Sequence, residues 1–368
     1  MLYLTISLSG SGYHPASWRV SGLPPGPDAA AIQRAAGAAE RGKLDAVLLG
    51  VPVVASAGAA EVNVLPLDPL PLLGSLIAVT RHIGLGAAWT IDYTEPFHVA
   101  RVFASLDHLS YGRTAWIADM FGAEKLMPRI GRPPPTTGDA EYCRRAGEFI
   151  DVVRKLWDSW EDAAFVLDKA SGTFVDPERV HPIEHAGANF AVRGPLNVPR
   201  PPQGNPLLVM HDPAESAARP FVAETADVVL TACETLAQTG DRYRELQALA
   251  SPRRLRVLAN IGVVLGETEA AAQRRAAELD AMLPPPKGLR FIGSPEQLVE
   301  MFALWQRAGA CDGFNLLPEV LDDIDLLVER AIPLGQKTGL LRTDYTGATL
   351  REHFGLARPL SQYADAAP

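Results

Sequence analysis

The chain has 368 residues, of which 47% are hydrophobic and 21% are charged, and its formal net charge is −9. This length and composition suit a soluble globular protein with a large core and lie in the size range of an α/β barrel. The acidic balance argues against nucleic acid or an anionic membrane as a partner, and no stretch approaches the ~20 apolar residues of a membrane span.

Short apolar runs alternate with amphipathic stretches along the chain. Leu2–Leu8 and Leu44–Leu49 are continuous apolar runs, typical of parallel strands with both faces buried. Between them, Asp28 is the expected N-cap of a helix that ends at Arg41, before Gly42. The same features predict further strands at 82–88, 114–120, 207–210, 227–230, 256–265 and 313–317. They predict further helices at 69–80, from 96 onward, and at 139–160, 213–225, 235–250, 267–283, 295–309 and 320–337.

This alternation amounts to about eight strand–helix cycles, which favours a closed (β/α)₈ TIM barrel. An open Rossmann-type sheet is the alternative, but Gly10-Ser11-Gly12 after the first strand lacks a third glycine. Residues 161–206 carry many turn formers and little periodicity, so we expect an irregular insertion. Such a segment forms either an active-site lid or a surface loop that contacts another subunit. We expect one domain over 1–338 and a tail, 339–368, that packs on the barrel or on a partner subunit.

The three cysteines, Cys143, Cys233 and Cys311, lie far apart and have no metal-ligand spacing. The N-terminus lacks the basic start and apolar core of a signal peptide. We therefore expect buried thiols in a cytoplasmic protein without a metal site.

Several distinctive strings run through the sequence, namely EPFH at 95–98, FASLDHLSYGR at 103–113, DKASGTFVDPERVHPIEH at 168–185, DGFNLLPEVL at 312–321 and LRTDYTGATLREHFGL at 341–356. Together they resemble the nitrilotriacetate/EDTA/dibenzothiophene-sulfone branch of the luciferase-like flavin-dependent monooxygenases, nearly from end to end. The resemblance implies a (β/α)₈ barrel that forms a homodimer or tetramer. It also implies reduced FMN from a separate NADH-dependent flavin reductase, O₂, and a small organic substrate held at the C-terminal mouth of the strands.

The resemblance assigns cofactor contacts to four positions. Thr90 matches a hydroxyl residue near the flavin ring, with Trp89 beside it, and Tyr142 matches a tyrosine that reaches the flavin phosphate. Thr94 stands where the family usually has asparagine. Three further residues, His14, Trp18 and Arg19, match a segment at the mouth of the first strand and are candidates for a substrate or altered site.

The sequence departs from the family pattern at strand ends. Val51 stands at an acidic position, and Met120-Phe121 replaces a pair of hydroxyl residues. After the fifth strand, His211-Asp212-Pro213-Ala214-Glu215 replaces Gln-Ala-Gly-Ser-Ser, which binds the FMN phosphate in the family. Pro213 has no N–H group, and a carboxylate about 4 Å from a phosphate repels it by about 1 kcal/mol in water. We therefore expect an altered flavin-phosphate site. The chain also looks shorter than the family around 121–138 and 283–288.

Other polar residues have competing interpretations. His211 and Asp212 follow a strand, so they either take part in the site or cap the chain locally. Asp119, at the end of the fourth strand, either binds and activates a substrate or forms a salt bridge. A structural role is favoured for five residues, Asp107, His108, His181, His185 and His353.

Three hypotheses follow. The first is an FMNH₂-dependent two-component monooxygenase with an altered flavin-phosphate site. The second is a flavin-free paralogue that acts as a small-molecule binder or as a non-catalytic subunit in a heteromer with a catalytic relative. The third is a deazaflavin-dependent oxidoreductase, which nothing in the phosphate region favours.

Overall fold

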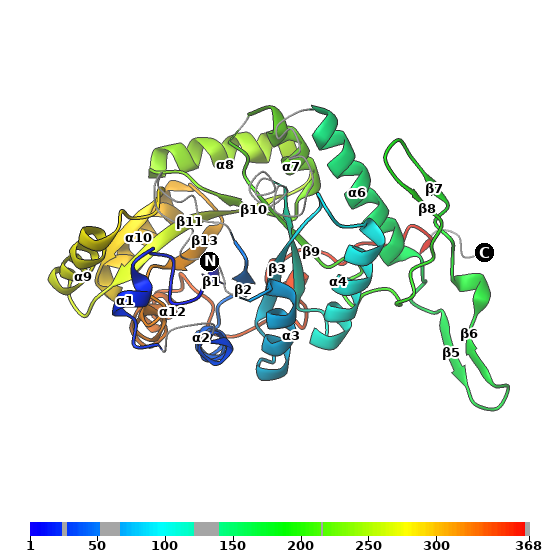
Figure 1. The fold of residues 1–368 in the computed structure, drawn as a ribbon, viewed down its shortest axis with the longest axis horizontal. Helices are drawn as coiled ribbons and strands as arrows, with labels where there is room; N and C mark the ends of the chain where they lie inside the picture. The colour runs from blue at the N-terminus through cyan, green and yellow to red at the C-terminus, as the bar shows by residue number, and fades with distance from the viewer. Residues whose placement is uncertain (24–27, 52–66, 121–139, 215, 365–368) are drawn as a thin grey trace.

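The structure, a computed structural model, describes residues 1–23, 28–51, 67–120, 140–214 and 216–364. Within these residues, eight parallel strands close into a barrel (Figure 1). In spatial order they are β1 (Tyr3–Leu8), β2 (Ala46–Leu49), β3 (Gly84–Thr90), β4 (Thr114–Asp119), β9 (Leu207–His211), β10 (Val228–Thr231), β11 (Arg256–Leu265) and β13 (Gly313–Pro318). Pairing of β10 with β11 and of β13 with β1 closes the ring. The predicted (β/α)₈ barrel is confirmed, and the open sheet is wrong.

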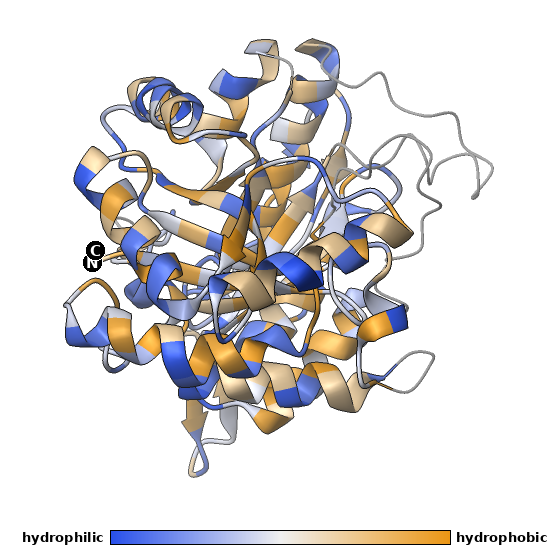
Figure 2. Ribbon diagram, turned by 90° about the vertical axis from the view of Figure 1, so that its left-hand side faces the viewer, coloured by the Kyte–Doolittle hydropathy of each residue, from blue (hydrophilic) through white to orange (hydrophobic). Residues whose placement is uncertain are grey.

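Helices surround the barrel close to the positions predicted from the sequence. They are α2 (Ala29–Arg41), α3 (Pro69–Val79), α4 (Pro96–Ser110), α6 (Ala140–Asp158), α7 (Arg219–Thr225), α8 (Leu236–Ala250), α9 (Glu269–Met282), α10 (Pro295–Ala308), α11 (Asp323–Leu326) and α12 (Ile332–Lys337). The expected cap is present, since the Asp28 carboxylate accepts from the Ala31 N–H, and Ser294 forms a capping box with Gln297 at the start of α10. Figure 2 shows hydrophobic and hydrophilic residues alternating along the outer helices, as expected for helices that pack one face on a barrel.

Several elements differ from the sequence prediction. The helix expected at 213–225 starts only at Arg219, after the 3₁₀ turn η3 (Ser216–Ala218). The helix expected at 320–337 is interrupted by the π-helical turn η4 (Leu327–Ala331). A further parallel strand, β12 (Arg290–Gly293), pairs with the second half of β11, and a short helix, α1 (Ser17–Val20), follows β1. None of these short elements has enough residues to show a periodicity.

Apolar side chains fill much of the barrel interior, beside a buried polar group in which Thr5 and Asn260 contact Asn315. Alternate strand positions point inward, and their side chains form a buried cluster that includes Ile117, Val209 and Leu230. The N-terminal end of the barrel is closed by α13 (Leu350–His353), whose Leu350 is fully buried and, with Phe354, joins this cluster. This core positions the polar residues of the opposite, C-terminal end above an apolar floor.

The insertion leaves the barrel at its N-terminal end. It contains two small antiparallel sheets, β5 (Phe165–Asp168) with β6 (Thr173–Val175) and β7 (His185–Ala186) with β8 (Ala191–Val192), which extend away from the barrel (Figure 1). The insertion joins the end of α6 to the start of β9, so it lies opposite the C-terminal mouth. This position favours a surface or subunit contact over a lid.

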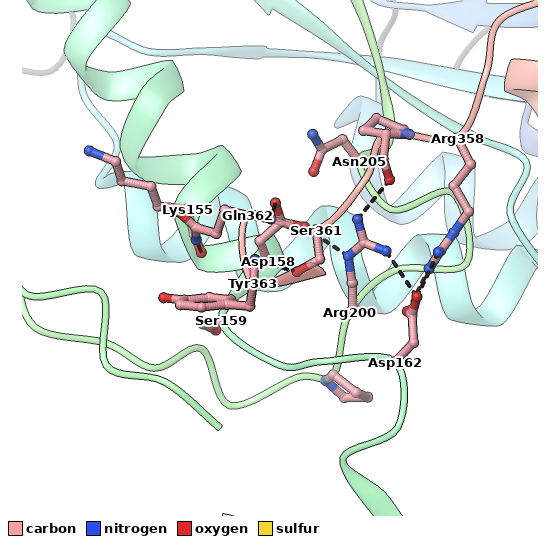
Figure 3. Close-up of polar contacts among 12 residues, drawn as sticks. Lys155, Asp158, Ser159, Asp162, Arg200, Asn205, Arg358, Ser361, Gln362 and Tyr363 are labelled. Carbon is pink, nitrogen blue, oxygen red and sulfur yellow. Dashed lines mark hydrogen bonds and ion pairs between the residues drawn. The ribbon is translucent and has the colours of Figure 1, made fainter. Parts of the chain in front are cut away.

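Ion pairs tie the insertion to the C-terminal segment. Arg200 contacts Asp158 at 2.8 Å and Asp162 at 3.1 Å, and Arg358 contacts Asp162 through both carboxylate oxygens (Figure 3). The ring of Tyr363 stacks on His181 at 3.9 Å between ring centroids. Because one carboxylate joins arginines from both segments, the insertion and the C-terminal segment form one structural unit.

Candidate functional site

Three candidate residues share one level of the C-terminal mouth. Thr90 and Asp119 are register partners on β3 and β4. Ile117 and Val209 are register partners on β4 and β9, so Asp119 and His211, each two residues further on, are again neighbours. Since side chains two residues apart in a strand share a face, Asp119 and His211 point into the barrel above the apolar cluster.

Thr90 belongs to a hydrogen-bonded group that also holds Tyr142. The Thr90 hydroxyl donates to Oδ2 of Asp92 at 3.1 Å, and it accepts from the Asp92 N–H at 3.2 Å. The Tyr142 hydroxyl lies 2.8 Å from Oδ1 of Asp92 and 2.7 Å from the carbonyl oxygen of Met120. Thr94 donates to the Thr90 carbonyl at 2.7 Å. Asp92, which the sequence analysis did not single out, thus connects two of the predicted cofactor residues, Thr90 and Tyr142, and Thr94 joins the group through the Thr90 carbonyl.

Burial dominates the electrostatics of this group. It raises the pKa of Asp92, and hydrogen bonds from Tyr142 and Thr90 partly oppose this shift. Burial also raises the pKa of Tyr142, and the neighbouring Asp92 charge adds to the effect. Tyr142 therefore stays protonated in the physiological range and acts as a hydrogen-bond donor. Trp89 lies beside this group, and its carbonyl accepts from the Trp116 indole N–H at 3.1 Å.

His211 has an unusual environment at the end of β9. Its Nε2 atom is inaccessible to solvent and has no hydrogen-bond partner among the described residues. Burial lowers the pKa of His211, whereas the charge of Asp119 opposes this shift. The imidazole is therefore neutral near pH 7 and has a nitrogen available to a bound molecule.

Asp212 turns away from the interior and forms ion pairs. Its carboxylate contacts Arg242 directly, lies 3.6 Å from Nε of Arg219 and accepts from the Thr231 hydroxyl at 3.0 Å. Both arginines also contact Glu245, at 3.1 and 3.2 Å. Repulsion of a phosphate by Asp212 was expected from the sequence, but two guanidinium groups offset its charge here. Glu215 lies outside the described residues.

His14 belongs to a second buried network, between β1 and β12. Its Nδ1 accepts from the Ala16 N–H at 3.0 Å, so Nε2 carries the proton and donates to Asp280 at 3.2 Å. Arg290 donates to both carboxylate oxygens of Asp280 and to both of Glu319, at 2.6–2.9 Å. Burial lowers the pKa of His14, and the Asp280 charge opposes that shift. This network holds the mouth of β1 against β12 and β13.

The remaining predicted residues lie apart from these groups. Trp18 is 52% exposed, and the Arg19 guanidinium lies over its ring. Val51 is buried in the barrel interior, whereas Phe121 and the segment 121–138 lie outside the described residues.

The five residues with a favoured structural role have such contacts. Asp107 accepts from the side chain and the N–H of Gln203, and His108 contacts the Pro199 carbonyl. The other three lie in the insertion or in the C-terminal segment, where His181 contacts Glu161, His185 contacts Glu148 of α6 and His353 contacts Gly347.

Asp92, Arg290 and Glu319 are site residues that the sequence analysis missed. Glu319 directly follows β13 and Asp92 lies two residues beyond the end of β3, and this position after a strand was the available signal. Arg290 had no such signal, because β12 itself was not predicted. Among the described residues, no group of three or more His, Cys, Asp or Glu side chains could hold a metal ion. No helix in the described ranges is long and apolar enough to span a membrane.

The sequence and the fold both match known proteins. A family model described as luciferase-like monooxygenase matches residues 10–288. The chain belongs to this family. It is 32% identical to N-acetyl-S-(2-succino)cysteine monooxygenase of Bacillus subtilis (strain 168), with 98% of each chain covered. It is 34% identical to nitrilotriacetate monooxygenase component A of Aminobacter aminovorans, with 96% of each covered.

Among solved structures, EDTA monooxygenase from Chelativorans sp. BNC1 is similar, with a TM-score of 0.86 and 26% identity over 97% of this chain and 99% of that one. The predicted luciferase-like resemblance is therefore confirmed. The alignment with the Bacillus enzyme extends over 436 positions, so this luciferase-like chain lacks segments that its relative has.

The described residues at the mouth of the barrel suit the ring end of an FMN molecule better than its phosphate end. The orphaned His211 Nε2 suits a polar ring compound in the barrel. At the phosphate end, the Tyr142 hydroxyl is already directed at Asp92, and α7 begins only at Arg219, after a 3₁₀ turn. These residues therefore do not form the cradle of backbone N–H groups and hydroxyls that binds the FMN phosphate in the family.

Proposed function

We propose that this chain is a two-component flavin-dependent monooxygenase with an altered flavin-phosphate site. It takes reduced FMN from a separate NADH-dependent flavin reductase and oxidises a small organic substrate with O₂. The flavin supplies the oxygen chemistry, and the protein binds, orients and excludes water.

The proposal rests on the polar residues that share one level of the barrel mouth. Thr90, Asp119 and His211 point into the C-terminal end of a closed barrel, above a buried apolar cluster. Polar groups that converge above an apolar floor are typical of a small-molecule site in this fold. Family membership supports oxygenation as the chemistry performed there.

The same proposal includes the oligomeric state and the cellular location of the enzyme. We expect a homodimer or tetramer in the cytoplasm, where the three cysteines, free in the structure, stay reduced. The insertion and C-terminal segment, far from the mouth, are available for subunit contacts. The division into a barrel of residues 1–338 and a tail from 339 is part of this proposal.

Anaerobic titration of the purified protein with reduced FMN tests the proposal, with absorbance and fluorescence as readouts. Saturable binding is expected, and Thr90→Val should weaken it. Ser105→Ala, which removes a hydroxyl that bonds only to its own helix α4 at the Arg101 carbonyl, is the matched control and should bind normally. Absence of saturable binding to the wild-type protein, alone or with the reductase and NADH, would refute the proposal.

A flavin-free paralogue is the second candidate. The commitment of the Tyr142 hydroxyl to Asp92 and of Asp212 to two arginines favours it, because both leave fewer groups for a phosphate. Stable co-purification with a catalytic relative, together with failure to bind FMN, would support it. Flavin bound in the barrel of the isolated chain would exclude it.

A further inference from the structure

The end of β9 places one nitrogen of His211 where a ligand must satisfy it. Nε2 is inaccessible to solvent and has no partner among the described residues. A buried polar atom without a hydrogen bond costs free energy that a bound ligand can recover. His211 follows Val209 by two positions, and Val209 belongs to the interior cluster, so the ring points into the barrel interior.

The neighbouring residue fixes the backbone at this point. The Asp212 N–H donates to the Leu230 carbonyl at 2.9 Å, and its carboxylate is held by Thr231, Arg219 and Arg242. Because Asp212 is anchored outside the barrel, His211 is held inside it. The ring is thus positioned before any ligand arrives.

The charges around His211 indicate which ligands it would accept. Asp119 is its neighbour on β4, and the Asp119 charge acts on both His211 and Asp92. The hydroxyls of Thr90 and Tyr142 are directed at Asp92, and the charge of Asp119 also acts on the phenol of Tyr93. Arg219, Arg242 and Arg290 are paired with carboxylates, whereas the positive charge of Arg145 acts on Asp92. Because Nε2 of His211 has no partner among the described residues, a ligand that carries an N–H or O–H group can supply its hydrogen bond.

We propose that His211 contacts the bound small molecule through Nε2, with the imidazole proton on Nδ1, so that Nε2 accepts a hydrogen bond from an N–H or O–H group of the ligand. This inference rests on the proposed function only in placing a ligand at the mouth. The N–H group can come from a flavin ring or from an organic substrate, since both present the same chemistry to the imidazole. His211 is then a specificity-determining residue of this chain.

Histidine-labelled NMR tests the contact directly. The chain has eight histidines, and His211→Gln identifies the signals of His211. The wild-type protein is titrated separately with FMN, with a library of neutral amides, amines and alcohols, and with nitrilotriacetate. A saturable shift of the His211 signals by FMN assigns the contact to the cofactor, and a shift by library members alone assigns it to a substrate. Either result supports the proposal, and the second does so even if FMN binding, and with it the proposed function, fails.

Binding measurements with variants supply the second readout. His211→Leu should weaken the binding of the shifting ligand by about tenfold or more, the equivalent of one lost hydrogen bond to a buried group, whereas His211→Gln should retain much of it. His98→Leu, at an exposed position on α4, is the matched control and should bind normally. The proposal is overturned if no probe shifts the His211 signals, if only nitrilotriacetate does, or if His211→Leu binds every probe as tightly as the wild type.

Discussion

The Tyr142 hydroxyl and the Asp92 carboxylate, 2.8 Å apart, join helix α6 to the end of β3 across the mouth of the barrel. Both groups are buried, and burial raises the pKa of each. A protonated phenol beside a carboxylate is a stable donor–acceptor pair, so the contact has a structural role whether or not a cofactor is present.

Tyr142→Phe should therefore destabilise the protein in the absence of flavin. The substitution leaves Asp92 buried without one of its donors, which costs about 1–3 kcal/mol. Chemical unfolding of the purified apoprotein measures the loss. Tyr111→Phe, at a residue that is 81% exposed, is the control and should change the free energy of unfolding little. Equal stability of Tyr142→Phe and wild type would show that the contact contributes nothing to the fold.

Asp212→Asn should strengthen anion binding at the exit of β9. The substitution removes one of the two carboxylates that pair with Arg219 and Arg242, the other being Glu245, so the two guanidinium groups gain net positive charge toward an incoming phosphate. We expect FMN or inorganic phosphate to bind about fivefold more tightly, equivalent to about 1 kcal/mol. Fluorescence titration measures the change for FMN, and Asp241→Asn, at an exposed position on α8, is the matched control. Unchanged affinity in Asp212→Asn would place the phosphate elsewhere.

Arg290→Lys should destabilise the network that holds His14. The guanidinium bonds both oxygens of two carboxylates, Asp280 and Glu319, and the latter is almost fully buried. Lysine cannot reproduce two bidentate contacts, and an unsatisfied buried carboxylate costs about 3–5 kcal/mol. Thermal unfolding compares this variant with Arg330→Lys, which alters a surface pair with Glu267 and should cost less than about 1 kcal/mol. Similar losses in both variants would contradict a special role for Arg290.

The barrel was predictable because its determinants are local. Buried parallel strands are continuous apolar runs, and each cap or turn of α2 and α10 lies within a few residues of its partner. Family strings then identified the superfamily. Short elements escaped prediction: β12 has only four residues, mostly half-buried, and carries no alternation.

The candidate site was only partly predictable because its partners are distant in the sequence. Thr90 and Tyr142 were named separately, and only the fold shows that Asp92 connects them. The sequence likewise did not show that Asp212, after β9, is paired with Arg242, because this arginine comes from helix α8, 30 residues further along the chain. The net charge at such a site depends on which residues the fold brings together, and a local sequence pattern does not show this.

Asp107 gives a pH-dependent test of the contact between the insertion and the barrel. It is fully buried, and burial raises its pKa to about 6, although Gln203 and the Thr114 N–H donate to it. The folded state therefore binds this proton more tightly than the unfolded chain, in which an aspartate has a pKa of about 3.9. The stabilisation is fully present below about pH 4 and is lost as the pH rises through about 6.

Asp107→Asn should remove this dependence. The difference in unfolding free energy between wild type and variant should change by about 2–3 kcal/mol between pH 4 and pH 7, with the wild type losing stability relative to the variant. Urea unfolding across this range measures it. A constant difference would mean that Asp107 has an ordinary pKa in the folded protein.

The closure of the barrel floor can be tested with a pair of leucines from the C-terminal segment. Leu350 is fully buried, one of its methyl groups lies where a side chain on Gly84 of β3 would be, and it belongs to the interior cluster, whereas Leu360 is 84% exposed. Leu350→Ala should cost about 2–5 kcal/mol because it opens a cavity beneath the barrel, and Leu360→Ala should change stability by less than about 0.5 kcal/mol. Chemical unfolding of both variants decides this. If the two losses were equal, the segment around Leu350 would not be an integral part of the barrel core.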